Sequence, residues 1–225
     1  MTYDQIAAEI TSASFAVLGS FHPGSDDCVH GAAGTLVLIG NAGPHMWRRF
    51  CAERADSSTT MDAWTEQALG DLAAALGGTM LFPFAKPPLP FLRWAQSANA
   101  GFVSPLGLNI HPEYGLWHAF RGALILPEVL ELPPPATDLH PCEACSEKPC
   151  LSTCPVAAFD GSSYDVDGCA AHIATPAGQD CLANGCKARR ACPVGTAYHY
   201  LPEQANFHMS AFLKARPNAP GRSND

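Results

Sequence analysis

The sequence predicts an α+β fold, in which a layered core of helices and strands precedes a small cysteine-rich module. Short apolar runs that end in Gly or Pro alternate with longer amphipathic segments up to about residue 130, which indicates a layered core. Eight of the ten cysteines then fall between Cys142 and Cys192. Such a change in composition is typical of a domain boundary.

We expect four parts along the chain. Residues 1–132 form the core, 133–138 a linker, 139–214 the cysteine-rich module, and 215–225 a disordered tail. The linker contains three consecutive prolines, which favour an extended chain. The tail is polar and contains Pro and Gly, as frayed chain ends commonly do.

Helices are expected where apolar residues recur at helical spacing. They are predicted at residues 2–14, 44–55, 61–76 and 91–99. Ser57 and Ser58 are the expected N-cap of the third helix, which Gly77 and Gly78 end.

Strands are expected in short runs of branched or aromatic apolar residues. Residues 35–40 and 79–84 match this pattern and predict buried strands. Residues 106–111 and 116–126 flank the turn-forming sequence Pro112–Gly115. That arrangement predicts a β-hairpin.

The composition also narrows the expected partners and compartment. The formal charge is −8 at pH 7 and no long run of Lys or Arg occurs, so we expect no nucleic-acid partner. The first residues lack the basic segment of a secretory signal, and no apolar stretch is long enough to cross a membrane. We therefore expect a cytoplasmic protein without a membrane partner, whose cysteines bind metal rather than form disulfides.

The spacing of the cysteines is the strongest signal in the chain. The first run is Cys-x2-Cys-x4-Cys-x3-Cys-Pro, Cys169 stands alone, and the last run is Cys-x4-Cys-x5-Cys-Pro. Bacterial ferredoxins with two [4Fe–4S] clusters use Cys-x2-Cys-x2-Cys-x3-Cys-Pro, and the fourth cysteine of each run binds the other cluster. The gaps are longer here, but both Cys-Pro pairs are present.

Eight thiolates suit two clusters, because each cube takes one thiolate per iron atom. The crossing rule assigns one cluster to Cys142, Cys145, Cys150 and Cys192, and the other to Cys154, Cys169, Cys181 and Cys186. Zinc and disulfides are the alternatives, but zinc favours paired Cys-x2–4-Cys knuckles and only Cys142 and Cys145 form a tight one. Cys28 and Cys51 are expected to be buried or partly buried thiols.

The segment Ile110–Pro127, IHPEYGLWHAFRGALILP, closely resembles a signature stretch of the cobalamin-processing CblC (MMACHC) family. The same segment, continued to the Cys-Glu-Ala-Cys sequence at 142–145, is similar to epoxyqueuosine reductase. In that enzyme and in corrinoid reductive dehalogenases, a two-cluster ferredoxin module follows a nitroreductase-like core. The resemblance covers roughly residues 33 to 200 and implies a flavin-nitroreductase-like core with a C-terminal ferredoxin-like module.

The resemblance also implies a function. Two [4Fe–4S] clusters would pass electrons to a corrinoid (cobalamin) bound by the core, for removal of its upper ligand or for reduction of Co(II) to Co(I). A ferredoxin, flavodoxin or reductase is then expected as electron donor. A flavin is possible in place of the corrinoid, because the wider kin of this fold bind FMN.

Two other functions stay open from the sequence. One is a ferredoxin-type electron carrier with no substrate of its own. The other is a corrinoid- or flavin-dependent reductase of a small organic substrate. The chain departs from epoxyqueuosine reductase, because neither the catalytic acid nor the helical repeat tail of that enzyme can be matched here.

Four residues of the resembling segment are candidates for contact with a corrinoid, namely His111, Trp117, Phe120 and Arg121. A His before Pro is more often structural, and core packing explains the two aromatic residues equally well. Arg121 lies within a strand and needs an anionic partner or an exposed position.

Three basic residues, Lys187, Arg189 and Arg190, lie between the last cysteines. In one interpretation, these side chains offset the negative charge of a cluster or dock a donor protein. In the other they form a solvated basic surface, as runs of charge commonly do.

Overall fold

The computed structural model describes residues 1–29, 33–56, 58–134 and 139–216. The chain divides into two compact units. Unit 1 consists of Met1–Phe102 and His118–Asp138, and Unit 2 of Val103–Trp117 and Leu139–Asp225. Most of the expected linker and tail, residues 135–138 and 217–225, lies outside the described residues.

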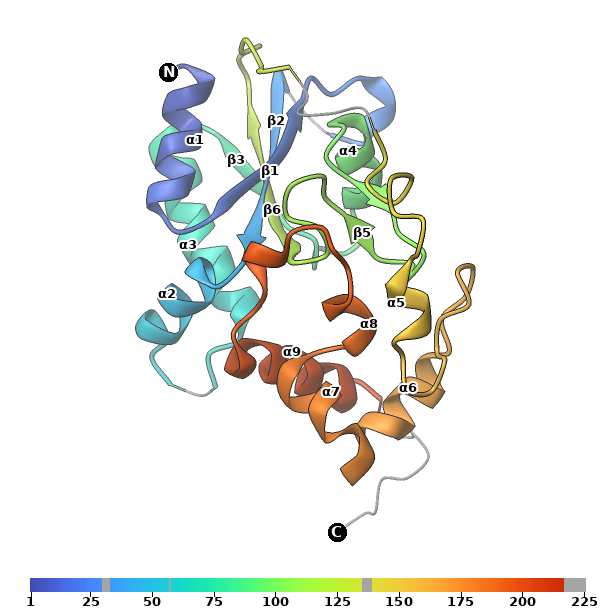
Figure 1. Ribbon diagram of the computed structural model, residues 1–225. Coiled ribbons are helices and arrows are strands. Elements are labelled where there is room, and N and C mark those ends of the chain that lie inside the picture. Colours follow the sequence, from blue (N-terminus) through green and yellow to red (C-terminus); the bar gives the residue numbers. More distant parts are fainter. Residues whose placement is uncertain (30–32, 57, 135–138, 217–225) are drawn as a thin grey trace. The chain divides into compact units, whose positions relative to one another are not determined.

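Unit 1 is built on a four-stranded antiparallel sheet in the order β1-β2-β6-β3 (Figure 1). The strands are β1 (Ala16–Phe21), β2 (Thr35–Ala42), β3 (Thr79–Leu81) and β6 (His118–Leu126). Every residue of β2 except Ala42 is buried, as expected of a central strand with apolar residues on both faces. The mixed helix-and-strand architecture expected from the sequence is confirmed.

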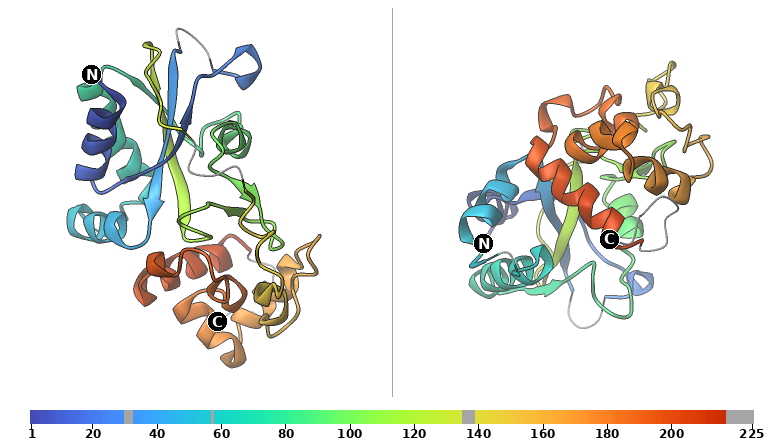
Figure 2. Two further views of the ribbon diagram at one scale, coloured as in Figure 1. Left: turned by 45° about the horizontal axis from the view of Figure 1, so that its top comes forward. Right: turned by 90° about the horizontal axis from the view of Figure 1, so that it is seen from below.

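The helices of Unit 1 lie close to their predicted positions. They are α1 (Tyr3–Ser12), α2 (His45–Glu53), α3 (Met61–Leu76) and α4 (Phe91–Ser97). The N-cap of α3 is Thr60, whose hydroxyl accepts from the Ala63 N–H, and not Ser58, which instead bonds Asp56. Ser57 lies outside the described residues. In Figures 1 and 2, α1 and α3 lie on one side of the sheet and α4 on the other.

The predicted hairpin between residues 106 and 126 is wrong. Its first arm forms β5 (Asn109–Ile110), which pairs with β4 (Phe102–Val103). Its second arm forms β6, which pairs along its whole length with β2, from His118 opposite Ala42 to Leu126 opposite Thr35. Burial between two long-range partners outweighs the local turn, which keeps only an isolated bridge between His111 and Gly115.

Unit 2 is made mainly of short helices. They are α5 (Pro149–Ser152), α6 (Val166–Ile173), α7 (Gln179–Asn184), α8 (Lys187–Arg190) and α9 (Pro202–Lys214). Figure 2 shows α9 beside α7, against which it packs. Pro begins α5 and α9, where its missing N–H costs nothing.

Within the described ranges, no helix has the length and apolar character needed to cross a membrane.

Candidate metal centre

The eight clustered cysteines lie on separate short elements of Unit 2. Cys142 and Cys145 precede α5, Cys150 lies in it and Cys154 follows it. The others lie on or next to the later helices, with Cys169 in α6, Cys181 in α7, and Cys186 and Cys192 on either side of α8. None of the ten cysteines forms a disulfide, so all eight thiols are available as ligands.

The thiols of Cys142, Cys145, Cys150 and Cys192 form a first group. Burial, followed by the neighbouring thiols of the other three, raises the pKa of Cys142 to about 11. Burial and the thiols of Cys192 and Cys145 raise the pKa of Cys150 in the same way. Because like charges disfavour one another only at short range, these mutual shifts show that the four sulfurs are neighbours.

The thiols of Cys154, Cys169, Cys181 and Cys186 form a second group. Burial raises the pKa of Cys169, and the thiols of Cys154 and Cys181 add to that shift. Cys186 is affected likewise by burial, Cys169 and Cys181. The same four cysteines line one apolar pocket, together with residues such as Phe159, His172 and Met209.

Each group therefore contains one cysteine from the other sequence run. Cys154 belongs to the first run but to the second group, and Cys192 belongs to the last run but to the first group. The assignment of these groups to iron–sulfur clusters stays a prediction.

Backbone N–H groups are directed at several of these sulfurs, which fits thiolate ligands. The Ala158 N–H donates to Cys154 Sγ over 3.3 Å. The N–H groups of Ala188 and Arg189 act on Cys186, and that of Val194 acts on Cys192. N–H donors stabilise negative charge on sulfur, so they offset part of the effect of burial, which raises the pKa of Cys186 and Cys192.

His172 adds a polar atom to the second group. Its Nε2 is buried and has no hydrogen-bond partner among the residues that the structure describes, and the side chain lines the pocket of that group. A buried ring nitrogen normally has a partner, so a polar group inside this pocket would satisfy it. Sequence spacing alone gave no signal for this residue.

No three His, Cys, Asp or Glu side chains in the described part of the chain converge on a point suited to a single metal ion. The four ligands of a [4Fe–4S] cube each bind a different iron atom. They surround a cube and need not converge in this way.

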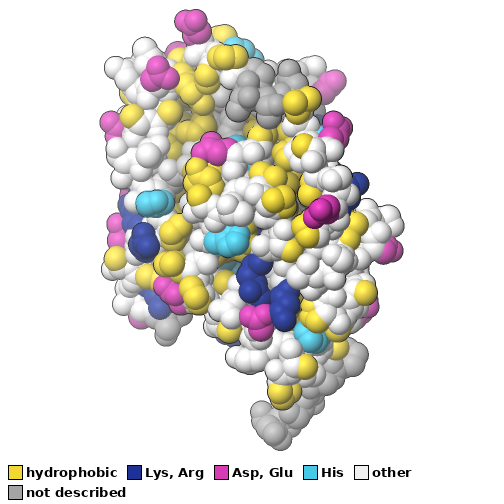
Figure 3. Space-filling model, viewed as in Figure 1, with side chains coloured by type: hydrophobic (Ala, Val, Ile, Leu, Met, Phe, Trp, Pro, Cys, Tyr) yellow, Lys and Arg dark blue, Asp and Glu magenta, His cyan; other side chains and the backbone are white. Residues whose placement is uncertain are grey.

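The three basic residues of this region have distinct roles. Lys187 and Arg190 both pair with Asp180, at 3.2 and 2.7 Å, and Figure 3 shows basic and acidic side chains side by side on this part of the surface. Arg189 instead donates from Nε to the Leu116 carbonyl over 2.8 Å. The solvated-surface interpretation therefore does not describe Arg189.

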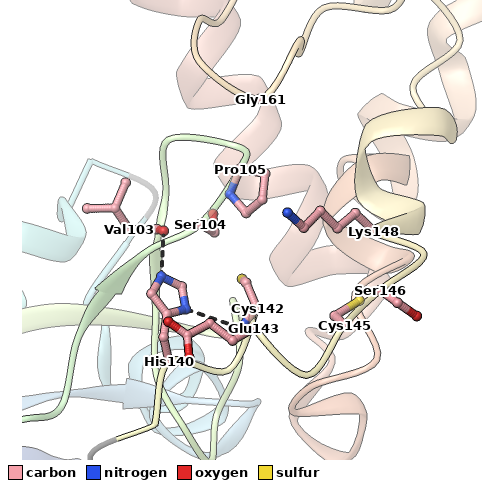
Figure 4. Close-up of a pocket in the computed structure, with 10 residues that line it drawn as sticks. All are labelled: Val103, Ser104, Pro105, His140, Cys142, Glu143, Cys145, Ser146, Lys148 and Gly161. Carbon is pink, nitrogen blue, oxygen red and sulfur yellow. Dashed lines mark hydrogen bonds between the residues drawn. The ribbon is translucent and has the colours of Figure 1, made fainter.

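A polar cleft borders Cys142 and Cys145 of the first group (Figure 4). His140 lies in its wall, where Nδ1 accepts from the Cys142 N–H over 3.1 Å and Nε2 bonds the Val103 carbonyl over 3.0 Å. Lys148 extends across the cleft towards Pro105. The first group thus borders an open polar cleft, whereas the second lines an apolar pocket.

The four candidate corrinoid contacts fall in different units. His111 and Trp117 belong to Unit 2, and Phe120 and Arg121 belong to Unit 1. His111 is buried, and its Nδ1 accepts from the Glu113 and Tyr114 N–H groups. Burial lowers the His111 pKa to about 4, so this ring is neutral.

The other three candidates have protein partners. Trp117 is buried, with its ring 4.3 Å from that of His199. Phe120 lies 5.9 Å from the ring of Phe91. Arg121 donates to Asn41 Oδ1 over 3.1 Å and lies 4.0 Å from Asp62, which supplies the anionic partner that a strand arginine needs.

The prediction for the two remaining cysteines is wrong, because Cys28 and Cys51 are both exposed. Cys51 lies in α2, whose buried residues are Met46, Trp47 and Phe50, so its side chain lies off the apolar face. Cys28 follows a short 3-10 turn and adopts a positive φ of 58°.

Comparison with known proteins finds solved structures with a similar fold. No protein-family model and no curated protein matches the sequence. The structure is similar to epoxyqueuosine reductase from Streptococcus thermophilus, with a TM-score of 0.53, 17% identity, and coverage of 91% of this chain and 70% of that chain. It is also similar to epoxyqueuosine reductase with an epoxyqueuosine-modified tRNA-Tyr stem loop, with a TM-score of 0.51, 16% identity, and coverage of 90% and 69%.

These comparisons bear on two expectations, the absence of a nucleic-acid partner and the resemblance to the CblC family. The exclusion of nucleic acid as a partner is wrong, because a protein of this fold has been solved with a tRNA stem loop. The net charge of −8 is a sum over the whole chain. It does not describe the charge of any one part of the surface. The comparisons give no support to the CblC part of the resemblance. The chain has a mixed α/β fold that matches the epoxyqueuosine reductase structures.

Proposed function

We propose that this chain is an iron–sulfur oxidoreductase that holds two [4Fe–4S] clusters in Unit 2 and passes single electrons to an acceptor. The observation that carries the proposal is the presence of two separate groups of four thiols. Each group takes a member from the other run of cysteines, as the crossing pattern of two-cluster ferredoxins requires. The fold shared with a reductase is consistent with this role.

The surroundings of the two thiol groups suit different steps of electron transfer in such a protein. When bound, a [4Fe–4S] cluster accepts and releases one electron at a time. The first group supplies thiolates next to an open polar cleft, which suits exchange of electrons with a partner. The second supplies thiolates in an apolar pocket, which excludes water.

Cluster content tests the proposal directly. Anaerobically purified protein is expected to contain about eight iron and about eight sulfide ions, from two four-iron clusters. Cys192→Ala and Cys154→Ala each remove one ligand of a different group, so each variant is expected to retain about half of the iron. Cys51→Ala, which changes an exposed cysteine outside both groups, is the matched control and keeps all of it.

Electron paramagnetic resonance after reduction should then show two different residual clusters in the Cys192→Ala and Cys154→Ala variants. Colourless wild-type protein without iron or acid-labile sulfide would exclude the proposal. Full iron content in both variants would exclude these two cysteines as ligands.

For the acceptor, we propose a corrinoid. Support comes from the Ile110–Pro127 segment and its resemblance to corrinoid-handling proteins. Phe120 offers a partly exposed aromatic face in Unit 1. Titration of the anaerobic protein with cobalamin, followed by its visible spectrum, tests this acceptor, with FMN as the parallel ligand. No spectral change and no binding at high excess would exclude a corrinoid.

A second acceptor, a modified nucleoside in RNA, is favoured by a different observation. The support comes from the similar structure, which was solved with an epoxyqueuosine-modified tRNA stem loop. Reduced protein would be incubated with epoxyqueuosine-containing tRNA and the nucleosides analysed. Conversion to queuosine supports this acceptor, whereas an unchanged nucleoside together with cobalamin reduction supports the corrinoid. If neither reacts while the clusters still reduce, the chain is an electron carrier.

A further inference from the structure

We infer that His172 donates a hydrogen bond from Nε2 to a sulfur of the cluster held by the second thiol group, and that this bond raises the reduction potential of that cluster. The inference rests on the proposed function, because it concerns a cluster of that function. It gives a role to a buried polar atom that electron transfer through the thiolates alone leaves unexplained.

Helix α6 places His172 beside one of the four thiols. Cys169 and His172 both belong to α6 and lie three residues apart, so their side chains extend from the same face of the helix. Both residues line the apolar pocket of the second group. The helix thus brings a thiol and an imidazole to the same enclosed space.

Both ends of this short helix are held by hydrogen bonds. At its start, the Asp165 side chain accepts from the Gly168 N–H over 2.9 Å. At its end, the His172 carbonyl accepts from the N–H and from the hydroxyl of Thr175, over 3.0 and 2.7 Å. The imidazole therefore extends from a fixed point in the wall of the pocket.

The Nε2 atom of His172 is buried, although the residue as a whole is only half-buried. No residue in the described part of the chain gives this atom a hydrogen-bond partner. Leaving a buried polar group unpaired costs free energy, and most such groups in folded proteins are paired. The expected partner is therefore a group that the pocket receives.

Sulfur is the only side-chain acceptor among the described residues that line this pocket. Besides the four thiols and His172, the lining consists of Lys187 and of apolar residues such as Phe159, Ile173 and Met209. Lys187 is itself a donor and pairs with Asp180 over 3.2 Å. A cluster in this pocket would present thiolate and sulfide sulfurs to the imidazole.

The imidazole could meet a cluster either as an iron ligand or as a donor to sulfur. Four thiolates already supply one ligand to each iron atom of a cube, which leaves no iron site for His172. The sulfurs are acceptors, so they favour the neutral form of the ring that carries its proton on Nε2. His172 therefore acts as a donor.

The sign of the effect follows from charge. Reduction adds one negative charge to the cluster and its thiolates, and a hydrogen bond to a charged acceptor stabilises that charge. Hydrogen bonds to the sulfurs are among the factors that set the potential of an iron–sulfur cluster. Removal of the donor therefore destabilises the reduced state and shifts the potential to a more negative value.

Two substitutions of His172 test the inference. His172→Leu removes the donor, whereas His172→Gln keeps one, because the Gln amide carries N–H groups. In a redox titration of the anaerobic protein followed by electron paramagnetic resonance, one midpoint potential is expected to become more negative in His172→Leu and the other to stay unchanged. The expected change in the ratio of reduced to oxidised cluster is about tenfold, or about 59 mV for a one-electron couple. His172→Gln should recover most of this shift.

His208→Leu is the matched control. His208 also lies in a helix of Unit 2, but its ring lies 5.5 Å from that of Tyr200, and it is not among the described residues of the pocket. This variant should leave both potentials unchanged. Equal shifts in His172→Leu and His172→Gln would mean that packing of the imidazole, rather than its N–H, matters, and would overturn the inference.

A second measurement decides the matter if His172→Leu loses iron. Cys192→Ala, which is expected to keep only the second cluster, is labelled with ¹⁵N-histidine, reduced and examined by pulsed electron paramagnetic resonance. His172 is the one histidine among the described residues of the pocket, so a weak nitrogen coupling, as from a hydrogen-bonded imidazole, supports the inference. No coupling, or the strong coupling of a nitrogen bound to iron, overturns it.

Unchanged potentials in His172→Leu, with full iron content, overturn the role of His172 and leave the proposed function standing. Absence of iron and sulfide from the wild type overturns the proposed function itself. The two failures are therefore distinguishable.

Discussion

The guanidinium of Arg189 lies 4.5 Å from the centre of the Trp117 ring. It also lies 4.6 Å from the ring of Tyr200, and two of its nitrogens donate to the Leu116 carbonyl. Arg189 belongs to α8, between Cys186 and Cys192. This one side chain thus links the segment Val103–Trp117 of Unit 2 to the part that carries both thiol groups.

Arg189→Lys is expected to lower the free energy of unfolding by about 2 kcal/mol, because an ammonium group replaces neither the planar stacking nor the paired donors. Urea unfolding followed by tryptophan fluorescence measures the change. Arg216→Lys is the control, since Arg216 lies over the Phe212 ring at 4.3 Å near the surface, and should cost less than about 0.5 kcal/mol. Equal losses in the two variants would contradict a linking role for Arg189.

A close backbone contact at Gly115 gives a second prediction. Gly115 has φ +57°, and an added Cβ would lie 2.0 Å from the Val194 carbonyl oxygen. Gly107 has φ +69° but nothing within 4 Å of such an atom. Gly107→Ala should therefore cost only backbone strain, about 1 kcal/mol, whereas Gly115→Ala should cost more than about 3 kcal/mol.

The same change should also affect the first thiol group, because the Val194 N–H acts on Cys192. Iron content and urea unfolding are measured together for the two alanine variants. Iron is expected to fall in Gly115→Ala and to stay at the wild-type level in Gly107→Ala. Equal iron content and equal stability of the two variants would show that the close contact between Gly115 and Val194 contributes neither to stability nor to iron binding.

His111 predicts a dependence of stability on pH. Burial lowers its pKa to about 4 in the folded protein, against an unfolded value of about 6.5. Between these values the unfolded chain binds more protons, so stability rises with pH and is lost as the pH falls below about 6.5. At pH 5.5 the loss relative to pH 7.5 is about 1.4 kcal/mol.

His111→Asn should remove this part of the pH dependence, because an Asn carbonyl can accept the Glu113 and Tyr114 N–H groups but does not titrate. Urea unfolding of both proteins at pH 7.5 and 5.5 measures the difference. The comparison cancels any acid loss of metal common to both. An equal pH effect in the variant would show that the wild-type dependence arises elsewhere.

Local sequence patterns predicted the elements whose structure depends on neighbouring residues. The helix over Met61–Leu76 has its predicted bounds, and Gly77 ends it with φ +72°, as the pattern indicated. Its N-cap was misplaced because Ser58 and Thr60 are chemically equivalent caps, and only the backbone path decides between them.

Long-range pairing was beyond what local patterns can predict. The turn at Pro112–Gly115 indicated a hairpin, but β6 pairs with β2, some eighty residues earlier in the chain. The candidate ligands came from cysteine spacing, which is a sequence property. The groups that act on their sulfurs, such as the Ala158 N–H, depend on the folded backbone and carry no spacing signal.

The pair of Asn41 and Arg121 gives the last prediction. Asn41, which is fully buried, accepts from Arg121 Nε over 3.1 Å, whereas Asp62, with 58% of its side chain exposed, lies 4.0 Å from the same guanidinium. Asn41→Ala removes a buried acceptor and should lower the free energy of unfolding by about 2 kcal/mol. Asp62→Asn breaks an exposed ion pair and should cost less than about 0.5 kcal/mol. Urea unfolding of both variants checks the order, and a larger loss in Asp62→Asn would mean that the carboxylate, rather than the amide, holds Arg121 in place.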